Sequence, residues 1–253
     1  MSQQKRRAAR RGSRFSIVLA LFACLFFAVL LILSAGLFFK VSDIRVEGVS
    51  AIPADGVREQ CGIQLQSNIL LLDKFSASRN LFAAYPYARE VNIRRQLPNI
   101  VIITVTEAAP ACVFVLQGRH WLADREGKLL ENRPARGDIG LPIVKGMTLL
   151  SPALGEEAAF PIGEEDRRYA LFLLLDALED SGLLGTVTEI DAARSYEMSF
   201  LYDGRLTVLL GEPKDLEYKL SYAEPSLERL EPGQRASLDV SAAREKNAVL
   251  VPE

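Results

Sequence analysis

The stretch VSDIRVEG at residues 41–48 decides the first part of the fold. Apolar and polar residues alternate in it, so that Ile44 and Val46 share one face and charged residues occupy the other. A period of two is typical of a strand with one buried face, and Gly48 can end such a strand. The stretch therefore predicts a half-buried β-strand, and its neighbours in the sequence show where the strand belongs.

A long apolar segment precedes this strand. Residues 15–39 contain no charged side chain, and a helix of that length measures about 37 Å. A bilayer core is about 30 Å thick, so the segment predicts an uncleaved membrane-spanning helix. A cleaved secretory signal is the first alternative, although its apolar region is usually shorter. A lipoprotein anchor at Cys24 is the second, although the bulky Phe22 stands where a small residue is expected.

The net charge of −2 is the sum of two opposite parts. Six basic residues and no acid precede the apolar segment, and the other 24 basic residues are opposed by all 32 acids. Basic clusters stay on the cytoplasmic side of a membrane, which predicts a cytoplasmic tail at 1–14 and an extracytoplasmic region at 40–253. A nucleic-acid-binding tail is disfavoured because the cluster directly adjoins the span. The residues that set this topology are Lys5, Arg6, Arg7, Arg10, Arg11 and Arg14.

Two helices and two strands are expected after the first strand. Pro53 and Gly62 bound a short helix, and Ser76 is the expected N-cap of a longer one. A β-branched run and an alternating run predict two strands joined by a turn at Leu97-Pro98-Asn99. The order β-α-α-β-β over residues 40–109 predicts a small α+β domain. The expected elements are residues 41–48, 53–62, 76–86, 90–96 and 100–106.

Residues 110–253 predict a second, mixed α/β domain with a mainly antiparallel sheet. Its most regular helix is expected at 166–184, where Leu171, Leu174, Leu175 and Leu178 form an i, i+3, i+4, i+7 stripe. A second helix is expected at 216–230, with an interruption near Pro225. The expected strands are residues 112–116, a glycine-turn hairpin within 121–130, 141–144, 187–191, 198–202, 206–210 and one extended stretch at 237–251.

The residue inventory indicates neither catalysis nor a bound metal or cofactor. His120 is the only histidine and no glycine-flanked serine motif accompanies it, so a structural role at the surface or half-buried is expected. Zinc is disfavoured because CxxC and histidine pairs are lacking. The acids at 156–157 and 164–166 could belong to a glycosidase, but acids near a helix start are explained by the helix dipole. Cys61 and Cys112 could pair or remain buried thiols.

These features, in this order, resemble the FtsQ/DivIB family of bacterial cell division proteins. Val46-Glu47-Gly48-Val49 after the span and Val105–Pro110 at the end of the first unit resemble its polypeptide-transport-associated (POTRA) domain. Trp121–Lys128 is similar to the family's aromatic-Leu-x-Asp-x-x-Gly hairpin. One departure is Ser241, which stands where the family often has arginine. Later matches are Asp203-Gly204, Val208–Gly211, Lys219-Leu220 and Asp239-Val240.

The resemblance implies a non-catalytic divisome scaffold in the bacterial cell (inner) membrane at the division septum. It implies a POTRA domain at 40–109 and an FtsQ-type β domain at 110–253, with FtsB/DivIC-like and FtsL-like membrane proteins as partners. The partners would bind by adding a strand to the last strand of the β domain. Core packing of the tyrosines and a covered closing strand stay open as alternatives. The candidate partner-binding residues are Ala248, Val249, Leu250, Val251, Tyr218 and Tyr222.

A second docking edge and two other functions complete these expectations. The strand around residues 91–94 of the POTRA domain would be a further open edge, where other divisome components could bind. A POTRA protein of a secretion or outer-membrane assembly system is disfavoured, because one unit is present without a barrel-length series of strands. A membrane-anchored cell-wall enzyme is disfavoured by the residue inventory. No nucleic-acid partner is expected.

Overall fold

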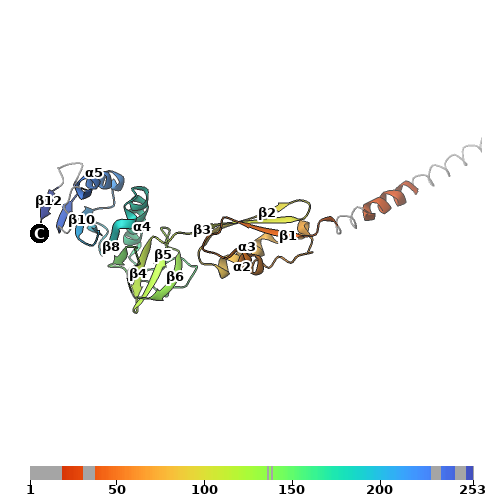
Figure 1. Cartoon of the computed structure of the whole chain (residues 1–253), viewed down its shortest axis with the longest axis horizontal. Coiled ribbons are helices and arrows are strands. Elements are labelled where there is room, and N and C mark those ends of the chain that lie inside the picture. The colour runs from red at the N-terminus through yellow and green to blue at the C-terminus, as the bar shows by residue number, and fades with distance from the viewer. Residues whose placement is uncertain are drawn as a thin grey trace, which may run out of the picture. The chain divides into compact units, whose positions relative to one another are not determined.

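The structure is a computed structural model that describes residues 19–30, 38–135, 137, 139–228, 235–242 and 249–252 (Figure 1). The chain divides into two compact units. Unit 1 comprises Met1–Leu81 and Glu90–Thr106, and unit 2 comprises Phe82–Arg89 and Glu107–Glu253. Both units combine helices with a β-sheet, which confirms the predicted α+β class.

The predicted membrane span is only partly covered by the described residues. Residues 19–30 are helical, and their large apolar side chains are exposed, as in Phe22 and Phe27. Within the described ranges, no helix combines the length and the apolar character that a bilayer crossing requires. Residues 15–18 and 31–37 of the predicted span lie outside the description, as do the six basic residues of the predicted tail.

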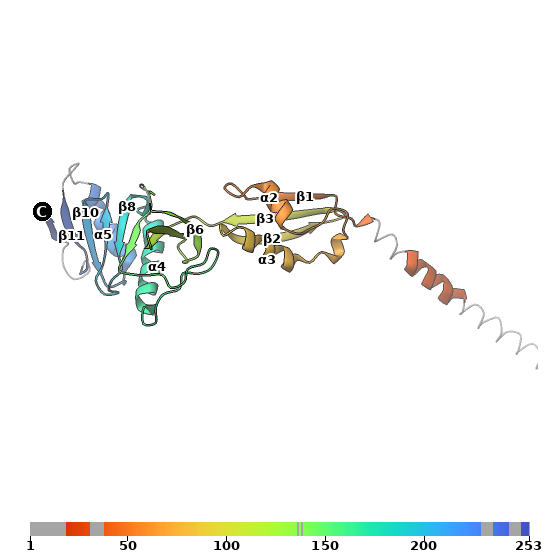
Figure 2. The same ribbon diagram turned by 90° about the horizontal axis from the view of Figure 1, so that it is seen from below.

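Unit 1 is built around a three-stranded sheet in the order β1-β3-β2. Strand β1 pairs with β3 in parallel, with Ile44 opposite Val101. Helices α2 and α3 lie on one face of this sheet (Figure 2), and side chains such as Val57 and Leu81 are buried. The predicted β-α-α-β-β order is confirmed. The elements are β1 (Asp43–Glu47), α2 (Ala54–Gln60), the 3-10 turn η1 (Ile69–Leu71), α3 (Lys74–Ala84), β2 (Ala88–Gln96) and β3 (Ile100–Glu107).

Helix α3 begins earlier than the sequence predicts. The backbone N–H groups of Phe75 and Ser76 both donate to Oδ1 of Asp73, at 3.0 and 3.1 Å. The Ser76 hydroxyl donates to Oδ2 of Asp73 at 2.6 Å. Asp73 is therefore the capping residue and Ser76 lies inside the first turn, so the predicted N-cap is wrong. A carboxylate has room for all three donors, whereas a hydroxyl offers one oxygen.

Gly48 ends β1 for a steric reason. Its φ is +79°, and a Cβ atom at this position would lie 2.5 Å from the carbonyl oxygen of Val105. A non-glycine residue would therefore be strained in its own backbone and would collide with β3.

Unit 2 contains a nine-stranded sheet in the order β12-β11-β10-β9-β8-β7-β4-β5-β6. Five of its strand pairs are antiparallel and three are parallel, so the predicted mainly antiparallel sheet is confirmed. The strands are β4 (Cys112–Leu116), β5 (Arg119–Ala123), β6 (Leu129–Pro134), β7 (Ile143–Lys145), β8 (Val187–Asp191), β9 (Met198–Tyr202), β10 (Leu206–Gly211), β11 (Ala236–Asp239) and β12 (Val249–Pro252).

Two helices accompany this sheet. The predicted leucine stripe of α4 (Glu165–Asp180) is fully buried. The helix ends four residues before the predicted Leu184, because Gly182 turns the chain at φ +72° before the short η2 (Leu184–Thr186). Helix α5 (Leu216–Glu228) runs through Pro225, so the predicted interruption is wrong. Pro225 removes only the bond to the Ser221 carbonyl, which water can satisfy because Ser221 is exposed.

The last predicted extended stretch is two strands rather than one. Strand β11 pairs with β10 in parallel, and β12 returns to pair with β11 in the antiparallel sense. Residues 243–248, which join the two strands, lie outside the described residues.

Candidate protein-binding site

Strand β12 forms one edge of the large sheet. In the described part of the chain it pairs with β11 and with no strand on its other side (Figure 1). The predicted residues Val249, Leu250 and Val251 belong to it, whereas Ala248 lies outside the described residues. The C-terminal strand therefore occupies the position that strand addition requires.

The direction of the backbone groups of β12 follows from its neighbours. The Val240 N–H donates to Leu209 O at 3.0 Å. Every second residue of β11 therefore directs its backbone N–H and carbonyl toward β10, and these residues are Ala236 and Leu238. Ser237 and Asp239 therefore face β12, where they stand opposite Val251 and Val249.

Leu250 and Pro252 alternate with Val249 and Val251, so their backbone groups point away from β11. Proline has no N–H and is tolerated in a strand where that group would face outward. The position of Pro252 in the register fits this direction. The open side of β12 thus offers the Leu250 N–H, the Leu250 carbonyl and the Pro252 carbonyl.

The two predicted tyrosines lie together on α5. The rings of Tyr218 and Tyr222 stack with their centroids 6.4 Å apart. Tyr222 packs against the hydrophobic core, while Tyr218 is 41% exposed. Helix α5 contacts β10, which is two strands from β12 in the sheet. The two tyrosines thus contact each other, and the packing of Tyr222 supports its role as a core residue.

Lys219 between these tyrosines ties α5 to the sheet. Its ammonium group donates to the carbonyl oxygens of Leu210 and Glu212, at 2.7 and 2.8 Å. Burial lowers the pKa of Lys219. The Lys219 side chain therefore joins α5 to the end of β10 and to the turn that follows it. Sequence reasoning noted Lys219 only as part of a motif, because its carbonyl partners become visible only in the fold.

Three further edge strands are present in the described residues, and one of them is β1 of the small sheet. Strand β2 is at the other edge of the small sheet, as expected for the segment around residues 91–94. Strand β6 is at the end of the large sheet opposite β12, and sequence reasoning missed it. The first residue of β6 is covered, because the Leu129 N–H donates to Glu156 O at 2.9 Å. Nothing in a single sequence shows which strand of a sheet will end at an edge.

The residues considered for catalysis do not converge. His120 is buried in β5, so its expected exposure is wrong, and its Nδ1 has no hydrogen-bond partner in the described part of the chain. Glu164 pairs with Arg167 at 2.6 Å, and Glu157 pairs with Arg168 at 3.4 Å. Glu165 and Asp166 lie in the first turn of α4, as the helix-dipole argument predicts. The described residues include no cluster of three potential metal ligands.

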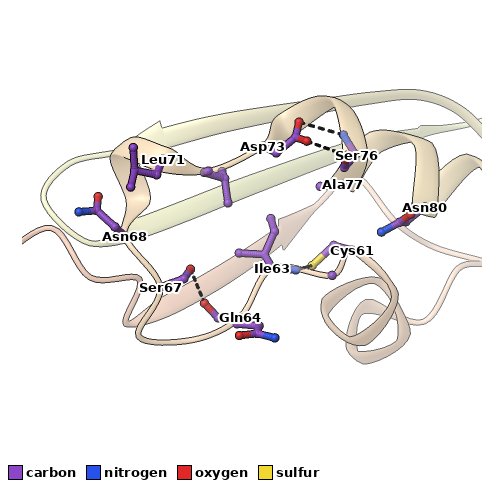
Figure 3. Close-up of a pocket in the computed structure, with 12 residues that line it drawn as sticks. Cys61, Ile63, Gln64, Ser67, Asn68, Leu71, Asp73, Ser76, Ala77 and Asn80 are labelled. Atoms are coloured by element: carbon purple, nitrogen blue, oxygen red, sulfur yellow. Dashed lines mark hydrogen bonds between the residues drawn. The ribbon is translucent and has the colours of Figure 1, made fainter. Parts of the chain in front are cut away.

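A pocket of about 320 Å³ lies in unit 1 between η1 and α3 (Figure 3). Cys61 and Ile63 line its inner side, and Leu71 stands on the η1 turn. Several polar groups in its wall bind one another locally. Ser67 Oγ donates to Gln64 O at 2.6 Å, and the Leu70 N–H donates to the Asn68 side chain. These bonds fix the loop that forms one wall of the pocket.

The two buried cysteines remain separate thiols. Cys61 is in unit 1 and Cys112 is in strand β4 of unit 2, and both are free. Burial raises the pKa of each thiol. Both therefore behave as small core residues.

Comparison with known proteins identifies the class. Residues 39–108 match the family model of the FtsQ-type POTRA domain. The chain is 29% identical over 189 residues to the cell division protein DivIB of Clostridium acetobutylicum, which covers 74% of this chain and 72% of that protein. It is 27% identical over 114 residues to the cell division protein FtsQ of Streptomyces bingchenggensis, across 45% of this chain and 43% of that one.

A solved structure is also similar. The major extracytoplasmic domain of DivIB from Geobacillus stearothermophilus matches with a TM-score of 0.31 and 13% identity, over 50% of this chain and 99% of that domain.

The match at residues 39–108 and the β1-β3-β2 sheet define a POTRA-containing protein with a second, β-rich unit. The relatives that match over most of the chain are cell division proteins named DivIB. Residues 39–108 thus form an FtsQ-type POTRA domain, and most of the chain is similar to cell division proteins named DivIB, which supports a role in cell division.

Proposed function

We propose that this chain is a non-catalytic scaffold of the bacterial divisome that binds FtsB/DivIC-type and FtsL-type membrane proteins by strand addition at β12. The observation that carries the proposal is the open side of β12. The Leu250 N–H and the carbonyls of Leu250 and Pro252 point away from β11, and no described strand pairs with them. An extended partner segment would satisfy these groups as a tenth strand of the sheet.

The energetics favour a partner that also contacts side chains. A hydrogen bond contributes a net of about 0.5–1.5 kcal/mol, so three bonds supply only part of a stable interaction. The remainder would come from apolar contacts with the alternating side chains of the edge. Strand addition at this short edge therefore sets the register of the partner, while neighbouring surfaces supply further affinity.

The proposed place of action is the extracytoplasmic face of the cell membrane at the division septum. The segment at 15–39 has no charged side chain and follows six basic residues, as expected for a single span with a cytoplasmic N-terminus. The helix at 19–30 exposes its large apolar side chains, as lipid contact requires. The acidic remainder of the chain, with both sheets, would then lie outside the cytoplasm.

Co-purification tests the proposal. Tagged full-length protein is purified from membranes with and without residues 249–253, and the recovered single-pass partners are measured. We expect the deletion to abolish partner capture and to lower the melting temperature without unfolding the large sheet, because among the described strands β12 pairs only with β11. Full capture by a folded deletion variant would show that β12 is not the docking strand.

A further inference from the structure

Four leucines are exposed at one end of unit 1, and we name them the apolar rim. Leucine side chains normally lose water on folding, because each contributes roughly 1.5–3 kcal/mol when fully buried. Four exposed leucines around one point therefore mark a contact surface. They come from the loop that carries η1 and from the β2–β3 turn. The exposed fractions are 59% for Leu65, 43% for Leu70, 84% for Leu71 and 57% for Leu97.

Backbone hydrogen bonds place the η1 loop next to the end of the apolar segment. The Ile69 N–H donates to Phe39 O at 2.8 Å, and the Gln66 N–H donates to Val41 O at 2.8 Å. The Val41 N–H in turn donates to Ser67 O at 2.9 Å. Leu65, Leu70 and Leu71 flank this short ladder. Figure 3 shows Leu71 on the η1 turn, with Asn68 beside it.

The β2–β3 turn is held to the same point. The Ser42 N–H donates to Asn99 O at 2.8 Å, and Leu97 is in the same turn. The Arg95 guanidinium donates to Leu72 O at 2.7 Å, which joins the strand before the turn to the η1 loop. The apolar rim therefore surrounds residues 39–42, where the charge-free segment ends.

The charges around the apolar rim favour an anionic surface. Lys40, Arg94 and Arg95 are basic and lie beside the ladder or before the turn. The two nearby acids are already engaged. Asp73 caps α3, and Asp43 pairs with Arg45 at 3.2 Å. A cluster of leucines with basic neighbours has the composition of a surface that lies on an anionic membrane.

We propose that the apolar rim of the POTRA domain inserts into the interfacial layer of the anionic bilayer that receives residues 15–39. This proposal rests on the membrane anchoring in the proposed function. The bilayer is the favoured occupant because the rim encloses the exit of the apolar segment, so anchoring brings these leucines to the membrane surface. The contact would hold the POTRA domain against the membrane rather than at the end of a free tether.

Tryptophan quenching in lipid tests the contact. Full-length protein is reconstituted in anionic vesicles whose acyl chains carry bromine both near the headgroup and near the bilayer centre, and the parent chain with its single Trp121 gives the background. Leu71→Trp reports the apolar rim, and Phe26→Trp reports the apolar segment. Ala51→Trp is the matched control, because Ala51 is exposed in the same unit beyond the far end of β1. Strand β1 separates it from residue 42 by roughly 16 Å.

We expect bromine to quench the added fluorescence of Leu71→Trp and Phe26→Trp and to leave that of Ala51→Trp unchanged. Strong quenching at Phe26 with Leu71→Trp behaving like Ala51→Trp would overturn the rim proposal and leave the anchoring intact. Absence of quenching at Phe26 would overturn the anchoring and the rim together. Because the Leu71 side chain is 84% exposed, its replacement leaves the core of unit 1 untouched.

Discussion

A pair of proline substitutions in β12 separates partner binding from folding. Leu250→Pro removes an N–H that points away from the sheet, whereas Val251→Pro removes one that faces Ser237 of β11. Proline is tolerated in an edge strand when its missing N–H faces outward, as Pro252 already shows. The two variants change neighbouring residues of the same strand but opposite sides of its backbone.

The expected magnitudes follow from this geometry. In Leu250→Pro a partner carbonyl would lose its donor inside the interface, which costs about 1–3 kcal/mol, or roughly 5- to 150-fold in the dissociation constant. The free energy of unfolding should change by less than about 0.5 kcal/mol, as for a surface substitution. In Val251→Pro the bond to β11 is lost, so β12 should detach and both stability and binding should fall.

The assay is a binding titration of each full-length variant with the purified single-pass partner, paired with chemical unfolding of the same samples. Val251→Pro serves as the matched control, because it shows what detachment of β12 does to both measurements. If Leu250→Pro bound its partner as tightly as the parent chain, the assignment of the outward N–H to the interface would be refuted.

Three further predictions concern stability. Gly48→Ala should destabilise unit 1 by more than about 1 kcal/mol, because a positive φ is combined with a Cβ atom 2.5 Å from Val105 O; thermal unfolding would detect it. Lys219→Met should cost about 1–3 kcal/mol in chemical unfolding, since two carbonyls lose their donor. Burial raises the pKa of Tyr87 from 10.0 to about 12, and its bond to Glu131 adds to this. Because the folded state holds this proton more tightly, its contribution is complete below pH 10 and should be lost between about pH 10 and pH 12. Tyr87→Phe should show a flatter alkaline stability profile in the same measurement.

Local patterns predicted many elements of this chain correctly. The alternation at 41–48 and the leucine stripe of α4 each depend on residues that are neighbours along one element. The spacing of apolar residues in the sequence therefore predicts directly which side chains are buried. The N-cap of α3 shows where such reasoning fails. Ser76 and Asp73 are both good capping residues, and only the backbone path decides which of them reaches the free N–H groups.

The sequence by itself determined the division of charge about an apolar segment, the order β-α-α-β-β and the absence of a recognisable catalytic motif. These properties depend on composition and on contacts between residues close in the chain. The tertiary structure alone decided that β12 ends the large sheet, and that the η1 loop and the β2–β3 turn meet at residues 39–42. Strand order and loop proximity are set by hydrogen bonds between distant residues, and a period of two is the same in a central strand and in an edge strand.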